Sequence, residues 1–533
     1  MKTSHLKLSQ FVLLSVATSA CAIAQDEKQH DKPNILVILA DDMGYSDIGC
    51  YGGEINTPNI DQLAREGIRF SQFYNAARCC PTRASLLTGL YPHEAGMGGM
   101  VSTHTGNKNT GPYQGYLNDE CVTIAEVLRD AGYYIAAAGK WHVGEDRPNW
   151  PIDRGFENYH GLISGASNYF DMTKTKSPNV KRVFVKDSTA YVPDQANFYM
   201  TDFITKSALE YLKVAQSKEK PFFLYLAYTA PHWPLHALPE DIQKYRGRFL
   251  KGWDVLREER FDRMKELEIV DSIMTLSERD DRVHAWETLS DDQKDKMDLL
   301  MSIYAAQLDR MDQGIGRVMD ELKQMGVSDN TLVLFLSDNG ACEEEGIWGK
   351  DFWGNFWDGK AVPGSGDSYH SYGRSWANLS NTPFRMFKSW VHEGGIITPL
   401  IARWPNGIDG VGRITKQPGT IMDIMATCCD LAQVEYPEYH NGKKIKPSRG
   451  RSLAPIFNGE TREKPGILFW EHQGNAAVRA GDWKLVSKDG EEWELYNLNE
   501  DPSELNNMIE KNQRQGDQMI EAYQKWSSSV GVK

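Results

Sequence analysis

The chain has 533 residues and a formal net charge of −14, and 41% of its residues are hydrophobic against 25% charged. This ordinary globular composition excludes a disordered, a collagen-like and a coiled-coil protein. A net acidic surface also argues against nucleic acid as a partner, so an anionic substrate would have to be held by a few concentrated cations.

The first 24 residues have the pattern of a secretory signal peptide. Basic Lys2 and Lys7 precede a short apolar run at 11–17, and Ala22-Ile23-Ala24 fits the small-residue cleavage pattern. The run is shorter than the ~20 residues that span a bilayer, and the sequence predicts no transmembrane segment. We therefore expect an exported protein, periplasmic or secreted. A buried N-terminal helix and a lipoprotein anchor at Cys21 are the alternatives.

The cysteines do not form a disulfide scaffold. Of the eight in the chain, Cys21 leaves with the leader, and the remaining seven contain no C-x-x-C pair. This argues against a zinc ribbon or a thioredoxin-type site, and the odd number predicts at least one thiol that is unpaired or chemically changed. The seven are Cys50, Cys79, Cys80, Cys121, Cys342, Cys428 and Cys429.

Short apolar runs alternate with helical patterns, which predicts a doubly wound α/β domain. Apolar spacings of three and four over 303–322 indicate one face of a helix. The charged segment 249–298 is typical of a solvated helical insertion. The runs expected as buried strands of a parallel sheet are 34–39, 134–138, 222–228, 331–336 and 400–404.

From about residue 442 the pattern changes to short alternating runs, at 466–471, 483–487 and 493–498. A final helical pattern follows Asp501-Pro502. We predict a small second domain of antiparallel sheet plus helix over 446–533, after an α/β domain over 25–445.

Polar side chains follow four of the predicted strands, and ligands of open α/β sheets bind beyond the carboxyl ends of strands. Three carboxylates and an amide at one edge would repel each other unless a cation neutralised them. Oxygen ligands suit calcium or magnesium rather than zinc. Each acid alone could equally be a helix N-cap or a loop residue. The oxygen ligands are Asp41, Asp42, Asp338 and Asn339, and Lys140, His142 and His232 follow the other strands.

The segment Cys79-Cys80-Pro81-Thr82-Arg83, followed by Leu87-Thr88-Gly89, is the most specific motif. Pro81 suits the first turn of a helix and would leave Cys79 just before its N-terminus, where unpaired N–H groups stabilise an anion. Arg83 adds a fixed positive charge. By itself the motif could also be a buried cysteine pair or a vicinal disulfide. It closely resembles the sulfatase signature C-x-P-x-R with L-T-G, in which the first cysteine is oxidised to formylglycine.

The resemblance to formylglycine-dependent sulfatases of the arylsulfatase family extends over nearly the whole chain. It implies the alkaline-phosphatase-like fold, a doubly wound mixed sheet flanked by helices with a smaller C-terminal domain. Leu90 and Asn497 are small departures away from the chemistry. The matching segments are Asp41-Asp42, 139–142 (G-K-W-H), 338–340 (D-N-G), 382–388 before Glu393-Gly394-Gly395, and 494–498 with Asp501-Pro502.

The resemblance also implies a reaction. A hydrated aldehyde made from Cys79 would attack the sulfate sulfur, and Asp41, Asp42, Asp338 and Asn339, with residue 79, would hold Ca²⁺ or Mg²⁺. The cation would lower the pKa of the attacking hydroxyl. A formylglycine-generating maturation enzyme is the implied partner.

The remaining roles fall to cationic and imidazole side chains. Lys140 and Lys388 would hold sulfate oxygens, and Arg83 would orient the diol. His232 would protonate the leaving alcohol, and His142 would accept a proton from the second hydroxyl. Either histidine alone could instead be a hydrogen-bonded structural residue.

The substrate is the least determined feature. The segments 343–345, 348–357 and 369–376 are expected to rim the pocket, where His370, Arg374 and, from the second domain, His472 could contact a sugar, although the aromatics could equally be loop packing. Exported bacterial sulfatases of this kind suggest a sulfated glycan, of galactose type, and an aryl sulfate is the other expected substrate. The alternatives are a phosphodiesterase or phosphonate monoester hydrolase of the same superfamily, and a binding protein never converted at Cys79.

Overall fold

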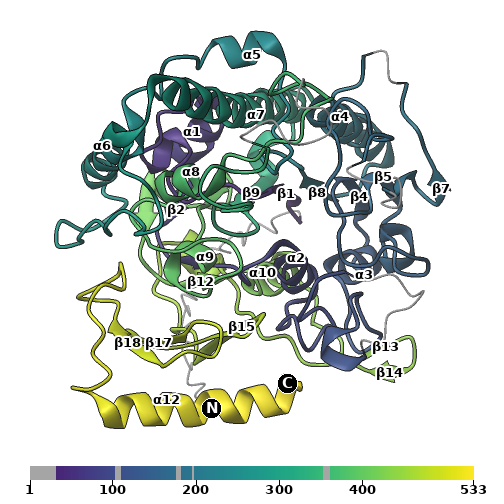
Figure 1. The fold of residues 1–533 in the computed structure, drawn as a ribbon. Coiled ribbons are helices and arrows are strands. Elements are labelled where there is room, and N and C mark those ends of the chain that lie inside the picture. The colour runs from purple at the N-terminus through teal and green to yellow at the C-terminus, as the bar shows by residue number, and fades with distance from the viewer. Residues whose placement is uncertain (1–31, 102–109, 176–181, 195–196, 352–360, 533) are drawn as a thin grey trace, which may run out of the picture. The chain divides into compact units, whose positions relative to one another are not determined.

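A ten-stranded mixed sheet forms the centre of the protein (Figure 1). The computed structural model describes residues 32–101, 110–175, 182–194, 197–351 and 361–532, and in these ranges the strand order is β11-β2-β10-β9-β1-β8-β4-β5-β6-β7. The outer strands are β11 (Arg413–Thr415), β2 (Ile68–Phe70), β5 (Asn158–Leu162), β6 (Phe184–Lys186) and β7 (Thr189–Ala190).

The four central strands are parallel and fully buried, as predicted. Their apolar runs have no polar alternation because helices cover both faces of the sheet. They are β1 (Asn34–Ala40), β4 (Tyr134–Gly139), β8 (Phe222–Ala227) and β9 (Thr331–Ser337).

The prediction of a parallel strand at 400–404 was wrong. β10 (Leu400–Arg403) is antiparallel to β9. The preceding short helix α9 (Glu393–Ile396) already lies at the carboxyl end of β9, where Gly340 donates its backbone N–H to Gly395 O at 3.2 Å. A strand that starts at the carboxyl end of β9 must run antiparallel to it. The apolar run itself does not indicate in which direction the strand runs.

Helices form a layer on each face of the sheet (Figure 1). Alternate residues of β1 pack into different cores: Leu36 and Ile38 against α1 (Pro58–Arg65), α4 (Met200–Lys218) and α7 (Asp291–Gln324), and Ile35 and Val37 against the opposite layer. That layer contains α2 (Cys79–Thr88), α3 (Ile124–Asp130) and α10 (Asp423–Leu431).

The segment 249–298 is not the solvated insertion that its charge suggested. Its helix α6 (Gly252–Glu266) buries Trp253, Phe261 and Met264 in the main core. Arg260 is also fully buried, because it forms ion pairs with Asp47 and Glu54 at 2.8 Å. The charges of this helix therefore pair inside the protein as well as at its surface.

The C-terminal part is an antiparallel sheet with one helix. The predicted runs form β15 (Leu468–His472), β17 (Trp483–Ser487) and β18 (Glu494–Asn497), and α12 (Gln513–Val530) packs on them through Met519. β16 (Asn475–Ala480) was missed because its small residues show little alternation. Residues 32–533 form one compact unit, and the boundary at 445 stays a prediction.

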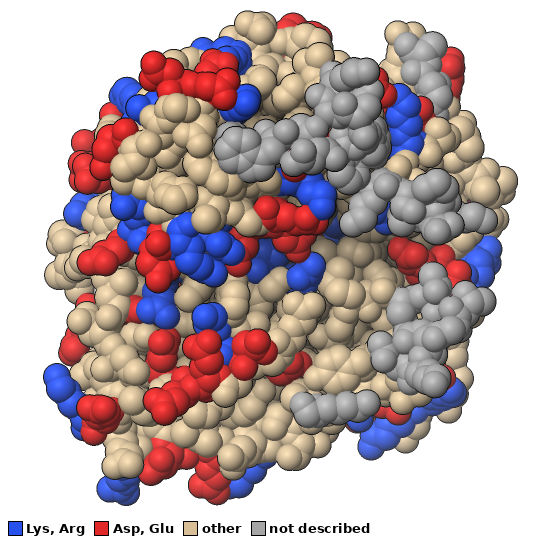
Figure 2. Space-filling view, viewed as in Figure 1, with Lys and Arg blue, Asp and Glu red and all other residues tan. Residues whose placement is uncertain are grey.

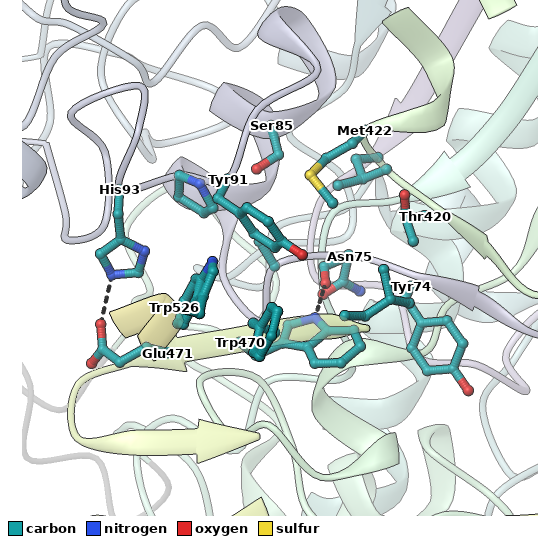
Figure 3. Close-up of a pocket in the computed structure, with 15 residues that line it drawn as sticks. Tyr74, Asn75, Ser85, Tyr91, His93, Thr420, Met422, Trp470, Glu471 and Trp526 are labelled. Carbon is teal, nitrogen blue, oxygen red and sulfur yellow. Dashed lines mark hydrogen bonds and ion pairs between the residues drawn. The ribbon is translucent and has the colours of Figure 1, made fainter. Parts of the chain in front are cut away.

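Polar contacts join this sheet to the α/β layers around a small aromatic cavity (Figure 3). Trp470 Nε1 donates to Asn75 O at 2.8 Å, and His93 Nε2 lies 2.7 Å from Glu471 Oε2. No residue predicted to act in catalysis lines this cavity in the described part of the chain.

A buried ion cluster makes a second connection. Lys484 Nζ lies 2.7 Å from Glu393 and 2.7 Å from Glu504, and its side chain is fully buried. Burial raises the pKa of Glu504, but the charge and hydrogen bond of Lys484, together with the neighbouring His392 and Arg385, leave that pKa below its usual value.

Replacing Lys484 with alanine is expected to lower the free energy of unfolding by about 3–5 kcal/mol, because two buried carboxylates lose their counter-charge. Because the pKa of Glu504 is lowered on folding, its ionised form stabilises the native protein at pH values above the ordinary glutamate pKa. The deficit of K484A should therefore be largest at neutral pH and shrink as pH falls through about 4.3. Denaturant unfolding at two pH values measures this. K525A, which removes an exposed pair with Glu521, is the control, and equal losses in both variants would contradict the cluster's role.

Candidate active site

The motif cysteine lies at the start of a buried helix. α2 begins at Cys79, and Arg78 before it is extended, so Cys79 is the first helical residue rather than the one preceding the helix. Pro81 does not fix the start more closely, because a missing N–H is tolerated throughout the first turn. Cys79 is 2% exposed, and a hydrogen bond from Cys80 together with the Lys140 charge holds its pKa well below the usual value despite burial.

The four predicted oxygen ligands converge at one edge of the sheet. Asp41 and Asp42 follow β1, and Asp338 and Asn339 follow its neighbour β9, so the register of the two strands brings their ends together. Asp42 donates its backbone N–H to Asp338 Oδ1 at 3.3 Å, and Asn339 Nδ2 donates to Asp42 Oδ1 at 2.8 Å. All four side chains are buried.

This cluster fits a hard divalent cation. Asp41 Oδ1 and Asn339 Oδ1 are buried and accept no hydrogen bond from the described residues. Burial and the charge of Asp41 raise the pKa of Asp338 to about 8 despite Arg83. Asp42 also has φ 66°, a strained conformation for a non-glycine residue. Crowded carboxylates with unused oxygens are the donors that Ca²⁺ or Mg²⁺ prefers.

Three cations surround the carboxylates. Lys140 Nζ donates to Asp41 Oδ2 at 2.6 Å, and Lys388 Nζ lies 2.7 Å from Asp42 Oδ1. Arg83 donates twice to Asp338 Oδ2, at 2.8 and 3.0 Å. An acidic chain thus concentrates fixed positive charge at one point.

The two histidines line the same cavity, one beside the cysteine pair and one beside the oxygen cluster. His142 Nε2 is 3.3 Å from Cys80 Sγ, and His232 Nε2 is 3.4 Å from Asp42 Oδ2. Burial lowers the pKa of each to about 4, in His232 against the opposing charge of Asp42. Both imidazoles are therefore neutral at pH 7 before an anion binds.

A cavity of about 270 Å³ opens onto these groups, lined among others by Cys79, His142, His232 and Lys388. A second cavity of about 240 Å³ shares Lys388 and Glu344 with it. Figure 2 shows Lys and Arg gathered with Asp and Glu around a hollow at the centre of this face. The lining residues that sequence reasoning missed include Arg78, Glu145 and Arg182, whereas Glu344 belongs to the segment 343–345 that was expected at the rim.

Glu343 and Glu344 of the predicted rim segment 343–345 line the cavities, but the three predicted sugar contacts lie elsewhere among the described residues. His370 Nε2 is 3.9 Å from Asp351, Arg374 pairs with Glu343, and His472 is fully buried with Nδ1 3.3 Å from Gly98 O. None of the three lines either cavity in the described part of the chain, and their contact with substrate stays a prediction. Of the aromatic stretch 348–357, residues 352–357 lie outside the described residues.

Arg182 and Glu145 could not be found from the sequence because they belong to loops without a motif. Arg78 directly precedes the motif residue Cys79, which was the one available signal. It forms an ion pair with Glu344 at 2.9 Å at the cavity wall.

Comparison with known proteins gives consistent matches. The family model described as Sulfatase matches residues 33–434, and that of the N-sulphoglucosamine sulphohydrolase C-terminal region matches 384–525. The chain is 36% identical over 529 residues to an uncharacterized sulfatase of Schizosaccharomyces pombe, covering 95% of each. It is 35% identical over 447 residues to an arylsulfatase of Klebsiella aerogenes, covering 83% of this chain and 95% of that one.

Solved structures share the fold. The crystal structure of Ps i-CgsB matches with a TM-score of 0.68 and 27% sequence identity over 93% of each chain. That protein has also been crystallised with k-i-k-neocarrahexaose. These matches include the strand ends that carry the candidate site.

Proposed function

Since the chain belongs to the sulfatase family of the alkaline phosphatase superfamily and is a sulfuric ester hydrolase, we propose that it is an exported, formylglycine-dependent carbohydrate sulfatase. One observation carries the proposal. Cys79 at the start of α2 shares a cavity with Lys388, His142 and His232, directly beside the buried oxygen cluster at the ends of β1 and β9.

Two groups would complete the site. Asp41, Asp42, Asp338 and Asn339, with residue 79, would hold Ca²⁺, or Mg²⁺ in its place, which neutralises sulfate oxygens and favours an ionised nucleophile. Formylglycine made from Cys79 by a maturation enzyme would supply a hydroxyl as the nucleophile.

The lysines would bind the sulfate group. Lys140 and Lys388 each face a carboxylate of the cluster, so both charges are already fixed at the place where an anion must sit. Arg83 donates to Asp338 and to the carbonyl of Lys140 at 3.0 Å. It therefore holds two strand ends together and orients the group at residue 79.

The histidines would move protons. His232 Nδ1 contacts the carbonyl of Trp233, which fixes the ring and leaves Nε2 as the atom that gains and loses a proton. A bound sulfate adds negative charge, which favours protonated His232 as the donor to the leaving alcohol. His142 is neutral and would accept a proton from the second hydroxyl of the hydrated residue 79, so that sulfate leaves and the aldehyde re-forms.

We propose a sulfated glycan, of galactose type, as substrate. The two cavities, which share Lys388 and Glu344, provide room beyond the sulfate position, and Ps i-CgsB, to which the chain is similar, has been crystallised with k-i-k-neocarrahexaose. His370, Arg374 and His472 are the proposed sugar contacts.

Inorganic sulfate release from a panel of sulfated monosaccharides, with nitrophenyl sulfate beside them, tests this function. Release from one sugar at one position would identify the substrate. Faster cleavage of a nitrophenyl phosphodiester than of nitrophenyl sulfate would overturn the proposal. Absence of an aldehyde at residue 79 in protein from the native host would favour a binding protein.

Export and domain division remain proposals. The leader 1–24 and Cys21 lie outside the described residues. Within the described residues, no helix has both the length and the apolar character needed to cross a membrane. We propose cleavage after residue 24, a periplasmic or secreted enzyme, and domains over 25–445 and 446–533.

Exhaustive chelation of divalent ions is expected to lower the rate of sulfate release about 100-fold, because a cation contributes several kcal/mol at such a site. Dialysis against a chelator followed by separate readdition of Ca²⁺ and Mg²⁺ measures the loss and its reversal. Undiminished activity after complete metal removal would contradict the cation site.

A further inference from the structure

Sulfur and imidazole side chains that could bind a soft metal ion gather at one wall of the cavity. The proposed sulfatase reaction does not use them together. Cys80 Sγ is 3.3 Å from His142 Nε2, and the ligand atoms of Cys79, Cys80 and His142 all lie within 4.8 Å of one another. Met100 adds another sulfur, with Sδ 3.9 Å from Cys80 Sγ. Three of the four line the cavity, so an ion from solvent can reach them.

The separations fit a tetrahedral ion. With metal–sulfur bonds of about 2.3 Å and metal–nitrogen bonds of about 2.0 Å, tetrahedral ligands lie about 3.8 Å apart for two sulfurs and about 3.5 Å apart for sulfur and nitrogen. The sulfur–sulfur distance of Cys80 and Met100 and the sulfur–nitrogen distance of Cys80 and His142 lie close to these values. The separations of Cys79 from Cys80 and His142 are at most 4.8 Å, so side-chain rotation has to bring the remaining ligand atoms to the ion.

We propose that the chain with unconverted Cys79 binds one Cu⁺ ion through Cys79, Cys80, Met100 and His142. Three sulfurs, one of them a thioether, select a soft ion such as Cu⁺. Zn²⁺ shares the thiolate and imidazole ligands but gains little from a thioether. A single positive charge also suits this wall better than two, because Lys140 and Lys388 are close to Cys79.

The site exists only while residue 79 is a thiol. Conversion of Cys79 to an aldehyde removes one sulfur and leaves an incomplete set. The copper site shares residue 79 with the proposed hard-cation site but uses none of Asp41, Asp42, Asp338 and Asn339, and its occupation needs neither substrate nor a hard cation.

The test uses the full chain, with cysteine at residue 79 confirmed by peptide mass spectrometry. Cu⁺ is titrated without oxygen in competition with a chromophoric Cu⁺ chelator. We expect one Cu⁺ per chain, with at least tenfold weaker binding in C80A and His142→Ala, on the order expected for loss of a ligand. Cys80→Ser keeps the side-chain volume and gives a second variant that opens no cavity.

Two comparisons make the result specific. Met100→Leu should weaken Cu⁺ binding and leave Zn²⁺ binding nearly unchanged. Cys429 on α10 also adjoins a cysteine and lies 3.9 Å from a methionine sulfur, that of Met425, but among the described residues it belongs to no three-ligand group. Cys429→Ala should bind Cu⁺ as the unaltered chain does. Absence of stoichiometric Cu⁺, or retention of full affinity in both Cys80 variants, would overturn the proposal.

Discussion

Replacing Cys79 with alanine is expected to lower the rate of sulfate release at least about 10⁴-fold, because the proposed nucleophile is made from this side chain and no other group can replace it. The fold should survive, since the change removes one small side chain from the start of α2. Sulfate release measures the loss, and thermal unfolding checks the fold.

Cys429→Ala is the matched control for this experiment. Cys429 is buried, follows another cysteine and lies on α10, away from the cavity. We expect full activity in Cys429→Ala with a similar unfolding temperature. Appreciable turnover by Cys79→Ala would refute the assignment of the nucleophile.

Replacing His232 with alanine is expected to separate substrates by their leaving groups. A sugar alkoxide is a poor leaving group and needs a proton, so its release should slow about 10²–10⁴-fold. Nitrophenolate leaves without help, and nitrophenyl sulfate hydrolysis should slow within about tenfold. Steady-state rates on a sulfated monosaccharide and on nitrophenyl sulfate give the two losses.

His236→Ala controls for damage to the same loop. His236 is fully buried and Nε2 contacts Ser368 O at 2.8 Å, so its loss would disturb the packing rather than proton transfer. Both substrates should then lose activity equally. Equal losses in His232→Ala would argue against an acid role for His232.

Local sequence patterns predicted the structure correctly where a single effect, such as burial of both faces of a strand, determines it. The apolar runs of β1, β4, β8 and β9 are long and unbroken because both faces of the sheet are covered, and this predicts buried parallel strands from the sequence. The oxygen ligands could be placed at one edge for the same reason: residues that follow adjacent parallel strands must end together.

Predictions failed where the outcome depends on partners distant in the chain. The charge of α6 suggested solvent, yet Arg260 is buried because Glu54 and Asp47 neutralise it. The direction of β10 is set by α9, which precedes it and lies at the carboxyl end of β9.

The central buried strands, the motif at Cys79 and the meeting of four oxygen-bearing side chains at the ends of β1 and β9 could thus be predicted from the sequence alone, because each rests on local spacing or on the rule for parallel strands. The tertiary structure alone decided which loops line the cavity. Arg182 and Glu145 reach it, while His370, Arg374 and His472 lie elsewhere among the described residues. Loop positions depend on many weak long-range contacts, and such contacts leave no periodic trace in a sequence.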